Sequence, residues 1–295
     1  MRYYSHGKIL LSGEYCVLHG AKALALPTRL GQALTVQPSQ GKYLSWTSLD
    51  SNKVIWFEAD FKLDDLSLVQ ANDVAVGKRL ETFLKFLRHR QVEFCRTPFH
   101  IQTELEFDRY WGLGSSSTLL SNLAEWAKCD PFDLLDNTLG GSGYDIACAQ
   151  ATGAICYQRN TGTPSYKAID FDPAFKKDLY FVYLNQKQDS QKEVADYLKK
   201  TPQSAFLEMI SNLTEAIISC KTLDSFQSLL TEHETLMSKH LNRPRLQEEY
   251  FPDFKGVIKS LGAWGGDFVL ACGGNPNYFK QKGFDVVIEY DKFIL

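Results

Sequence analysis

The hydrophobic positions along this chain follow two different periods. Apolar and polar residues alternate over residues 99–107, which is typical of a half-buried strand. Over residues 72–90 the apolar residues recur every three or four positions and share one face of a helix, which Asn72 can cap. The apolar residues after Ser117 are spaced by three, four and seven positions, so they predict a second amphipathic helix.

Short apolar runs and turn residues predict further elements in both halves. Pro131 suits the first turn of a helix that ends near residue 140. The other expected helices cover residues 145–151, 191–200, 204–221, 223–241, 254–261 and 277–282. The other expected strands cover residues 8–18 (a strand with a turn at its end), 33–36, 54–57, 154–158, 179–184, 268–272 and 284–290. Because strands and helices are mixed throughout, we expect an α+β fold with a sheet and packed helices in each domain.

The length of 295 residues favours about two domains. The pattern of expected elements changes after Pro164, and we place the boundary between the two domains within residues 160–178. The expected domains are therefore residues 1–165 and residues 166–295.

The net charge and the apolar runs of the chain indicate which kinds of partner it can bind. The net charge of −3 disfavours a broad surface for nucleic acid, so an anionic substrate would need a local positive site. No apolar run approaches 18 residues, and the apolar stretch near the N-terminus is too short for a signal peptide. We expect neither a nucleic-acid nor a membrane partner.

The seven cysteines form no CxxC pair, which fits reduced thiols in a cytoplasmic protein. Cys16, Cys148 and Cys272 lie in apolar stretches and are expected to be small buried residues. His233 and His240 are seven residues apart on an expected helix and form no HExxH pattern. We expect a surface or packing role for them rather than metal binding.

The segment Gly112–Ser117, GLGSSS, stands directly before the second amphipathic helix. Ser115, Ser116 or Ser117 can cap that helix. A glycine-rich entry to a helix leaves backbone N–H groups pointing outward, and the helix dipole favours an anion there, commonly phosphate. The segment lacks the third glycine of the dinucleotide fingerprint, and the chain has no GxxxxGK[ST] motif. An ordinary capped helix after a tight turn is the alternative.

Three segments resemble, in this order, the GHMP kinases, the family of galactokinase, homoserine kinase, mevalonate kinase and phosphomevalonate kinase. They are HGKILLSGEYCVLHGAKALALP, GLGSSST with GGSGYDIACA close behind, and GAWGGDFVLACGG. The landmarks run from Lys8 to Gly274, essentially the whole chain. The resemblance implies a two-domain fold with the active site in the cleft between the domains. The N-terminal domain would bind nucleotide and phosphate, and the C-terminal domain would be ferredoxin-like.

The resemblance also implies roles for particular residues. Asp145 falls on the family's catalytic aspartate, and Lys8 falls on the lysine that pairs with it. Ser116 falls where the family places a serine that contacts Mg²⁺ and phosphate. The phosphates of ATP are expected on Gly112, Leu113, Gly114, Ser115, Ser116 and Ser117. Residues expected to line the site or the substrate are Glu14, Gly143, Gly262, Ala263, Trp264 and Gly265, within a motif that continues to Gly266.

The chemistry of these residue types fits phosphoryl transfer to an alcohol. That reaction needs the hydroxyl held in line, its proton accepted and the charge on the γ-phosphoryl stabilised. A carboxylate such as Asp145 can accept the proton, and the positive end of a helix and the Lys8 ammonium would favour its ionised form. Gly143 would leave room for the substrate. The alternative for Asp145 is a plain helix N-cap.

Two positions depart from the family pattern. Leu134 stands where mevalonate kinases have a glutamate that binds Mg²⁺. Asp133 and Asp136 flank it but point in other directions on a helix. Trp264 replaces a common glycine, and its indole could fill space near the substrate or narrow the pocket.

The resemblance favours a kinase of the mevalonate pathway of isoprenoid biosynthesis, using ATP and Mg²⁺. The patterns GEY, GSGYD and GGD are closer to phosphomevalonate kinases, whereas the short chain and VLHGAKALA are closer to mevalonate kinases. A kinase for a sugar or an amino-acid alcohol, and a catalytically silent binding or regulatory protein of the same fold, are the alternatives. We expect a small-molecule substrate and a monomer or homodimer in the cytoplasm.

Overall fold

The computed structural model describes residues 1–159, 164–186, 190–199 and 201–295. The chain divides into two compact units that alternate along the sequence. Unit 1 comprises Met1–Gly7, Leu30–Arg109 and Leu113–Gln150, and unit 2 comprises Lys8–Arg29, Tyr110–Gly112 and Ala151–Leu295. The expected domain limits at residues 165 and 166 stay a prediction.

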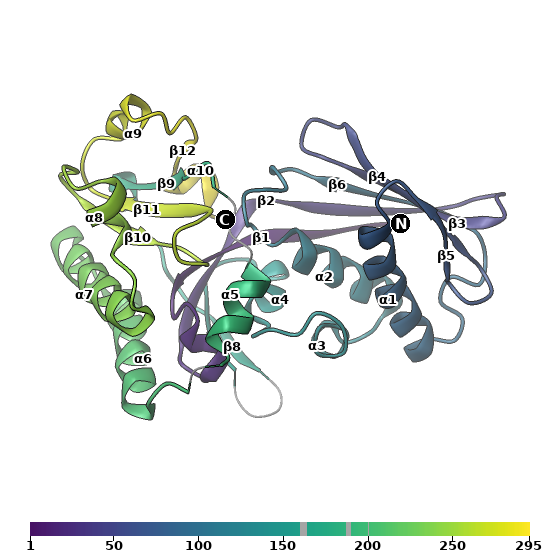
Figure 1. The fold of residues 1–295 in the computed structure, drawn as a ribbon, viewed down its shortest axis with the longest axis horizontal. Helices are drawn as coiled ribbons and strands as arrows, with labels where there is room; N and C mark the ends of the chain where they lie inside the picture. The colour runs from purple at the N-terminus through teal and green to yellow at the C-terminus, as the bar shows by residue number, and fades with distance from the viewer. Residues whose placement is uncertain (160–163, 187–189, 200) are drawn as a thin grey trace. The chain divides into compact units, whose positions relative to one another are not determined.

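Unit 1 is a layer of strands with helices along one side (Figure 1). Its strands are paired in the order β5-β4-β3-β6-β2, and β1 pairs with β2. The strands are β1 (Arg2–Ser12), β2 (Ala23–Pro38), β3 (Tyr43–Leu49), β4 (Ile55–Lys62), β5 (Leu68–Ala71) and β6 (Phe99–Leu105), the first two of which continue into unit 2. The helices are α1 (Val74–Arg90), α2 (Ser115–Ala127), α3 (Pro131–Asp136) and α4 (Tyr144–Ala149).

The core of unit 1 joins these helices to the strands. Side chains such as Phe83 on α1 and Leu120 on α2 pack with Trp46 of β3 in one buried cluster. The expected helix over residues 72–90 is confirmed, but the expected cap is wrong. Asp73 caps α1, because its carboxylate accepts the first free N–H groups, whereas Asn72 accepts the N–H of Glu58.

Unit 2 contains an antiparallel sheet in the order β10-β11-β9-β12 (Figure 1). Its strands are β9 (Leu179–Tyr183), β10 (Val257–Ser260), β11 (Phe268–Cys272) and β12 (Val287–Glu289). The pair β7 (Ile155–Gln158) and β8 (Ser165–Ala168) extends from the first part of β2. The helical segments are η1 (Cys16–His19), η2 (Lys176–Asp178), α5 (Ser190–Tyr197), α6 (Ser204–Ser219), α7 (Leu223–Leu241), α8 (Leu246–Tyr250), α9 (Asn277–Gln281) and α10 (Tyr290–Phe293).

The core of unit 2 gathers apolar side chains from helices α6 and α7 and from the sheet. Ile210 and Met237 pack with Val182, Ile258 and Val269, all of them at most 2% exposed. The strand expected at 268–272 and the helix expected at 223–241 are confirmed with the same limits. The helix expected over residues 191–200 corresponds to α5, and Lys200 lies outside the described residues.

One expected helix of unit 2 is wrong. Residues 254–261 do not form a helix, because β10 runs through this segment and pairs antiparallel with β11. The β-branched pair Val257 and Ile258 favours a strand, and the pairing partner lies beyond the next loop.

Two further features of the described residues bear on the expectations. All seven cysteines are free, and Cys16, Cys148 and Cys272 are buried as expected. No helix in the described part of the chain is long and apolar enough to cross a membrane.

Candidate functional site

The first part of the candidate site is the entry to α2 in unit 1. Gly114 is the residue before the helix and has a left-handed backbone, with φ of 85°. No side chain caps this end of the helix. The expected serine cap is therefore wrong, since all three serines belong to the first turn and Ser117 donates to the carbonyl of Gly114. The exposed Ser116 and the first-turn N–H groups remain available to an anion.

A buried polar network fixes α2 against the strands of unit 1. Thr118 donates to Oε1 of Gln32 at 2.8 Å, and the amide of Asn122 donates to the carbonyl of Gln32 at 2.9 Å. Ser5 of β1 donates to Oδ1 of Asn122 at 2.9 Å. Each of these groups is buried and bonded, so the network specifies one position for the helix.

Asp145 lies in the first turn of α4, which contacts α2 within unit 1. Gly143, with φ of 82°, is the residue before this helix, so the alternative of a plain N-cap for Asp145 is wrong. The side chain is partly exposed, and its Oδ1 lies 3.1 Å from the N–H of Ile146. Asp145 thus begins a short helix beside the helix that begins with the three serines.

The missing metal-binding glutamate has no replacement on α3. Leu134 is fully buried in the core of unit 1. Asp133 uses both carboxylate oxygens to pair with Arg90, at 2.8 Å for each contact. The described residues contain no group of three or more His, Cys, Asp or Glu side chains placed to hold a metal ion. Of the expected ligands, the Ser116 hydroxyl is exposed at the helix entry, and it fits an Mg²⁺ ion held mainly by nucleotide phosphates.

The second part of the candidate site belongs to unit 2 and begins with the turn after β1. Glu14 in this turn is buried, and its carboxylate accepts from Lys259 of β10. Tyr15 uses its hydroxyl to accept the backbone N–H of Trp264 at 2.8 Å and to donate to Glu193. The turn is therefore bonded directly to the glycine-rich motif near the end of the chain.

Trp264 is a core residue of unit 2. Its side chain is 5% exposed and packs in the same cluster as Tyr15 and Met237. The indole N–H donates to the carbonyl of Pro244 at 3.0 Å. The indole therefore fills space in the core of unit 2, and its expected place near the substrate stays a prediction. Its neighbours Gly262, Ala263 and Gly265 form the loop between β10 and β11.

Asp267 was not among the expected site residues. A Cβ atom on Gly112 would lie 2.1 Å from Oδ2 of Asp267, so this carboxylate packs directly on the first glycine of the segment Gly112–Ser117. Asp267 is 7% exposed and has φ of 53°, a backbone conformation that is strained for a residue other than glycine. The GGD ending of the glycine-rich motif was the available signal.

Lys8 lies in β1, at the point where the chain passes into unit 2. Its expected partner Asp145 belongs to unit 1. The pairing of these two residues stays a prediction, as do the roles of the other expected site residues.

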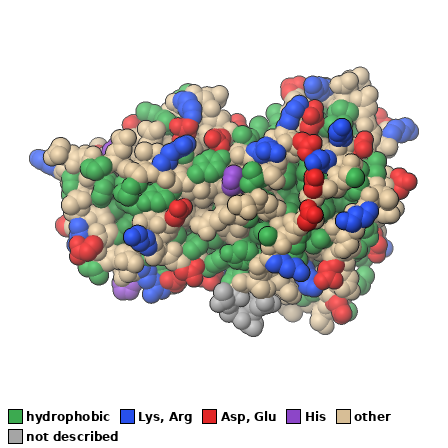
Figure 2. All heavy atoms as spheres, turned by 180° about the vertical axis from the view of Figure 1, so that it is seen from behind, with side chains coloured by type: hydrophobic (Ala, Val, Ile, Leu, Met, Phe, Trp, Pro, Cys, Tyr) green, Lys and Arg blue, Asp and Glu red, His purple; other side chains and the backbone are tan. Residues whose placement is uncertain are grey.

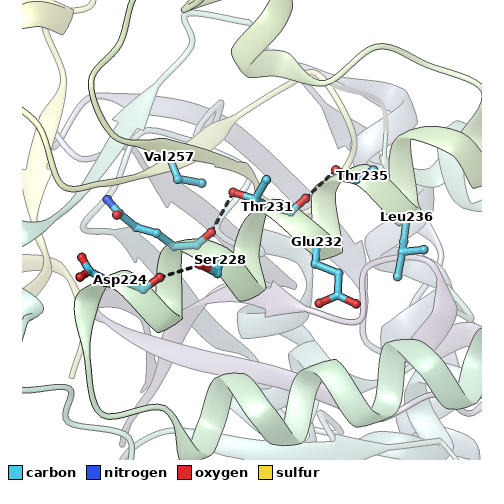
Figure 3. Close-up of a pocket in the computed structure, with 8 residues that line it drawn as sticks. Asp224, Ser228, Thr231, Glu232, Thr235, Leu236 and Val257 are labelled. Atoms are coloured by element: carbon cyan, nitrogen blue, oxygen red, sulfur yellow. Dashed lines mark hydrogen bonds between the residues drawn. The ribbon is translucent and has the colours of Figure 1, made fainter.

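A separate surface pocket of about 660 Å³ lies along α7 and the edge strand β10 (Figure 3). Its hydroxyl groups are already used within the helix. Ser228, Thr231 and Thr235 donate to carbonyls four residues earlier, at 2.9, 2.8 and 2.7 Å. The pocket contains none of the expected site residues, and we assign it no chemistry.

The surface drawn in Figure 2 mixes charges of both signs. Lys and Arg side chains stand among Asp and Glu side chains, and this face shows no extended basic patch.

The chain was compared with protein-family models, with the sequences of curated proteins and with solved structures. No protein-family model matches the chain, and no curated protein matches its sequence. A solved mevalonate kinase has a TM-score of 0.71 at 16% identity and covers 98% of each chain. The Streptococcus pneumoniae phosphomevalonate kinase, solved with phosphomevalonate and AMPPNP, has a TM-score of 0.69 at 17% identity and covers 97% of this chain and 99% of its own. Lactococcus lactis galactokinase, solved with galactose, has a TM-score of 0.63 at 13% identity and covers 98% of this chain and 92% of its own.

These likenesses confirm the resemblance at the level of the fold. The chain has the two-domain α+β fold of the GHMP kinases.

Proposed function

We propose that this protein is an ATP-dependent kinase that transfers the γ-phosphoryl group of ATP to a hydroxyl or phosphate group of a small molecule. The entry to α2 carries this proposal. Gly112 and Gly114 have left-handed backbones, no side chain caps the helix and Ser116 is exposed beside it. Such an entry suits the phosphates of a nucleotide. The AMPPNP in the pneumococcal structure of the same fold supports nucleotide binding.

Asp145 is the residue we propose to accept the proton of the acceptor hydroxyl. Its carboxylate is partly exposed, and it lies at the start of a helix that contacts α2. A positioned carboxylate contributes roughly 10²–10⁴ in rate as a general base. Lys8 would hold the Asp145 carboxylate in its ionised, correctly oriented form.

Magnesium would be held by the phosphates of ATP and by the Ser116 hydroxyl, and it would neutralise the charge that develops on the transferred group. The backbone N–H groups at the start of α2 orient the phosphates. The buried network around Asn122 keeps that helix end in place.

For the acceptor we propose an intermediate of the mevalonate pathway, phosphomevalonate ahead of mevalonate. The motifs GEY, GSGYD and GGD support the phosphorylated substrate. The solved structures of the same fold include a mevalonate kinase and a phosphomevalonate kinase, and both support the pathway.

The test is the release of ADP with a panel of acceptors: mevalonate, phosphomevalonate, homoserine, galactose and further sugars. We expect turnover with one of the first two and a kcat/KM at least 100-fold lower for the others. Preferential turnover of homoserine or a sugar would replace the proposed substrate but keep the kinase reaction.

A silent nucleotide-binding protein is the second candidate, and two observations favour it. Leu134 is buried in the core where a metal-binding glutamate was expected, and Asp133 is occupied by Arg90. A nucleotide titration combined with the turnover assay distinguishes the candidates. ATP binding without ADP release for any acceptor would favour the silent protein.

A further inference from the structure

Four ionisable side chains are buried together in unit 2. They are Lys259 on β10, Glu14 in the turn after β1, and Glu234 and His233 on α7. Their side chains are at most 4% exposed. Buried charges are costly unless they are paired and hydrogen-bonded, so the arrangement of this cluster must account for every charge.

Lys259 lies between the two carboxylates. Its ammonium donates to Glu14 and to the carbonyl of Ser260, and it lies 3.1 Å from Oε1 of Glu234. These contacts use its three N–H groups. Ser260 also donates its hydroxyl to Glu234 at 2.8 Å. With both glutamates ionised, the cluster would contain two negative charges and one positive charge in a place without solvent.

The contact between Glu14 and His233 indicates where a further proton lies. Nε2 of His233 accepts the backbone N–H of Gly13 at 3.3 Å, so this nitrogen presents its lone pair and the imidazole is protonated on Nδ1. Oε2 of Glu14 lies 3.4 Å from the same Nε2. Two acceptors that face each other in a buried site repel, whereas a proton on Oε2 makes the contact attractive.

We propose that Glu14 is protonated in weakly acidic solution, loses this proton as the pH rises through neutrality, and that the proton makes Glu14 and Lys259 positioning residues of the candidate site. The pair joins the turn that contains Tyr15 to β10, three residues before Gly262. Tyr15 in turn accepts the N–H of Trp264 in the glycine-rich loop. Loss of the proton leaves a net negative charge in the cluster and loosens the connection between the two segments. The positioning role rests on the function proposed above.

The groups that face Glu14 agree with this assignment. Burial raises the pKa of Glu14 to about 7, although Lys259 lowers it. Burial lowers the pKa of His233 well below its usual value, and Lys259 lowers it further, so the imidazole is neutral. Burial alone would lower the pKa of Lys259. The nearby Glu14 and Glu234 outweigh burial and raise this pKa, so the ammonium stays charged. From η1, burial raises the pKa of the Cys16 thiol to about 12, so it is neutral as well.

The sign of the pH dependence follows from linkage. The pKa of Glu14 in the folded protein lies above its ordinary value of 4.5. A raised pKa contributes stability that is fully present below the unfolded value and is lost as pH rises through the folded value. The stability of the protein should therefore fall between about pH 5 and pH 8 because of this group.

The decisive variant is Glu14→Gln. The amide oxygen can accept from Lys259 as the carboxylate does, and the amide N–H can donate to Nε2 of His233 as the proposed proton does. We expect the wild-type Tm to fall by on the order of 5 °C between pH 5 and pH 8 relative to the variant. The variant should keep the wild-type Tm at pH 5. An equal pH slope for both proteins would overturn the proposal.

Glu234→Gln is the matched variant within the same cluster. It removes a like charge beside Glu14 and keeps an oxygen that can accept from Ser260. We expect the fall in Tm that belongs to Glu14 to be absent in Glu14→Gln. In Glu234→Gln we expect it to move to lower pH, because the Glu14 carboxyl then ionises more readily. A fall that stays at the wild-type pH in Glu234→Gln would contradict the assignment.

The positioning role is tested by kinetics on the same proteins. Between pH 6 and pH 8 we expect the KM of the acceptor to rise several-fold in the wild type and to change by less than half as much in Glu14→Gln. A KM that is independent of pH while Tm falls would show that the cluster only stabilises the fold. A protein that turns over no acceptor would contradict the proposed function, and the Tm curves would still decide whether Glu14 holds the proton.

Discussion

The carboxylate of Asp267 occupies the space that a side chain on Gly112 would need. A Cβ atom at Gly112 would lie 2.1 Å from Oδ2 and 2.9 Å from Oδ1 of Asp267. The glycine also has φ of 66°, which side chains disfavour. The first residue of the segment Gly112–Ser117 and the last residue of the GGD pattern are therefore packed against each other within unit 2.

Gly112→Ala should lower both stability and nucleotide affinity, because the methyl group must displace the Asp267 carboxylate. We expect a loss of about 1–3 kcal/mol in the free energy of unfolding and a weaker AMPPNP complex. Thermal unfolding and a nucleotide titration measure these effects. Gly283→Ala is the matched control, since Gly283 has φ of 85° in the same unit but nothing within 4 Å of its added Cβ atom. Equal losses of stability and of AMPPNP affinity in the two variants would show that the contact with Asp267 does not contribute to either.

Asp145→Asn should keep the fold and most of the ATP affinity and lose turnover. The amide is nearly isosteric but cannot accept the substrate proton, so we expect kcat to fall by roughly 10²–10⁴. A smaller loss would fit a loose transition state that needs little early proton removal. Tm and kcat are measured on one preparation, with Glu125→Gln on the exposed face of α2 as the control for charge removal. Near-normal kcat with a lower Tm would remove Asp145 from the active site.

The sequence predicted well those features that depend on local pattern. The helix at 223–241 and the strand at 268–272 were located from apolar runs and turn residues, and the glycine-serine segment was correctly placed at a helix entry. The cap of α2 was wrong because the backbone of Gly114 already provides the turn, which places all three serines inside the helix. A cap depends on backbone angles that neighbouring residue types do not determine.

The features that the sequence missed depend on contacts between distant residues. Lys259 was expected within a helix over residues 254–261, yet it is buried in a strand beside a carboxylate 245 residues earlier in the chain. Asp267 was passed over because its contact with Gly112 joins two loops. The backbone and indole N–H groups of Trp264 bond to Tyr15 and to the Pro244 carbonyl, two partners that the sequence pattern did not indicate. The pattern of residues along one sequence does not indicate which distant residues come into contact.

Trp264→Phe should destabilise the protein more than it alters catalysis. The substitution keeps an aromatic ring in the core but removes the indole N–H that donates to the carbonyl of Pro244, so we expect a loss of about 1–2 kcal/mol. Trp264→Gly would leave a large cavity and cost about 3–5 kcal/mol. Chemical denaturation measures both, and the kinetics of the folded Phe variant should stay within a few-fold of wild type.

A ligand-dependent change in fluorescence that disappears in Trp264→Phe would indicate that the indole senses the bound ligand. The same signal in both proteins, together with the same kinetics, would assign Trp264 to packing alone. Four other tryptophans contribute to the emission, so the comparison between the two proteins is essential.

Glu81 should make unit 1 less stable in acid. Its nearly buried carboxylate accepts from Lys78, Lys85 and the backbone N–H of Leu68, which joins α1 to the start of β5. Burial alone would raise the pKa of Glu81, but the hydrogen bonds from the two lysines and from Leu68 outweigh burial and lower it to about 2. A lowered pKa contributes stability that is present above the unfolded value, near 4.5, and is lost as pH falls toward 2.

Glu81→Gln removes that contribution, so its Tm should be lower than that of wild type at pH 7 by a few degrees, and the two values should converge as pH falls from about 5 to about 2. The exposed Glu58→Gln on β4 serves as the control, and we expect its Tm to follow the wild type throughout. Circular dichroism melts at intervals of half a pH unit resolve the difference. The difference in Tm between Glu81→Gln and wild type could instead be the same at pH 7 and at pH 3. That result would mean that the Glu81 carboxylate stabilises the protein through its shape and packing rather than through its charge.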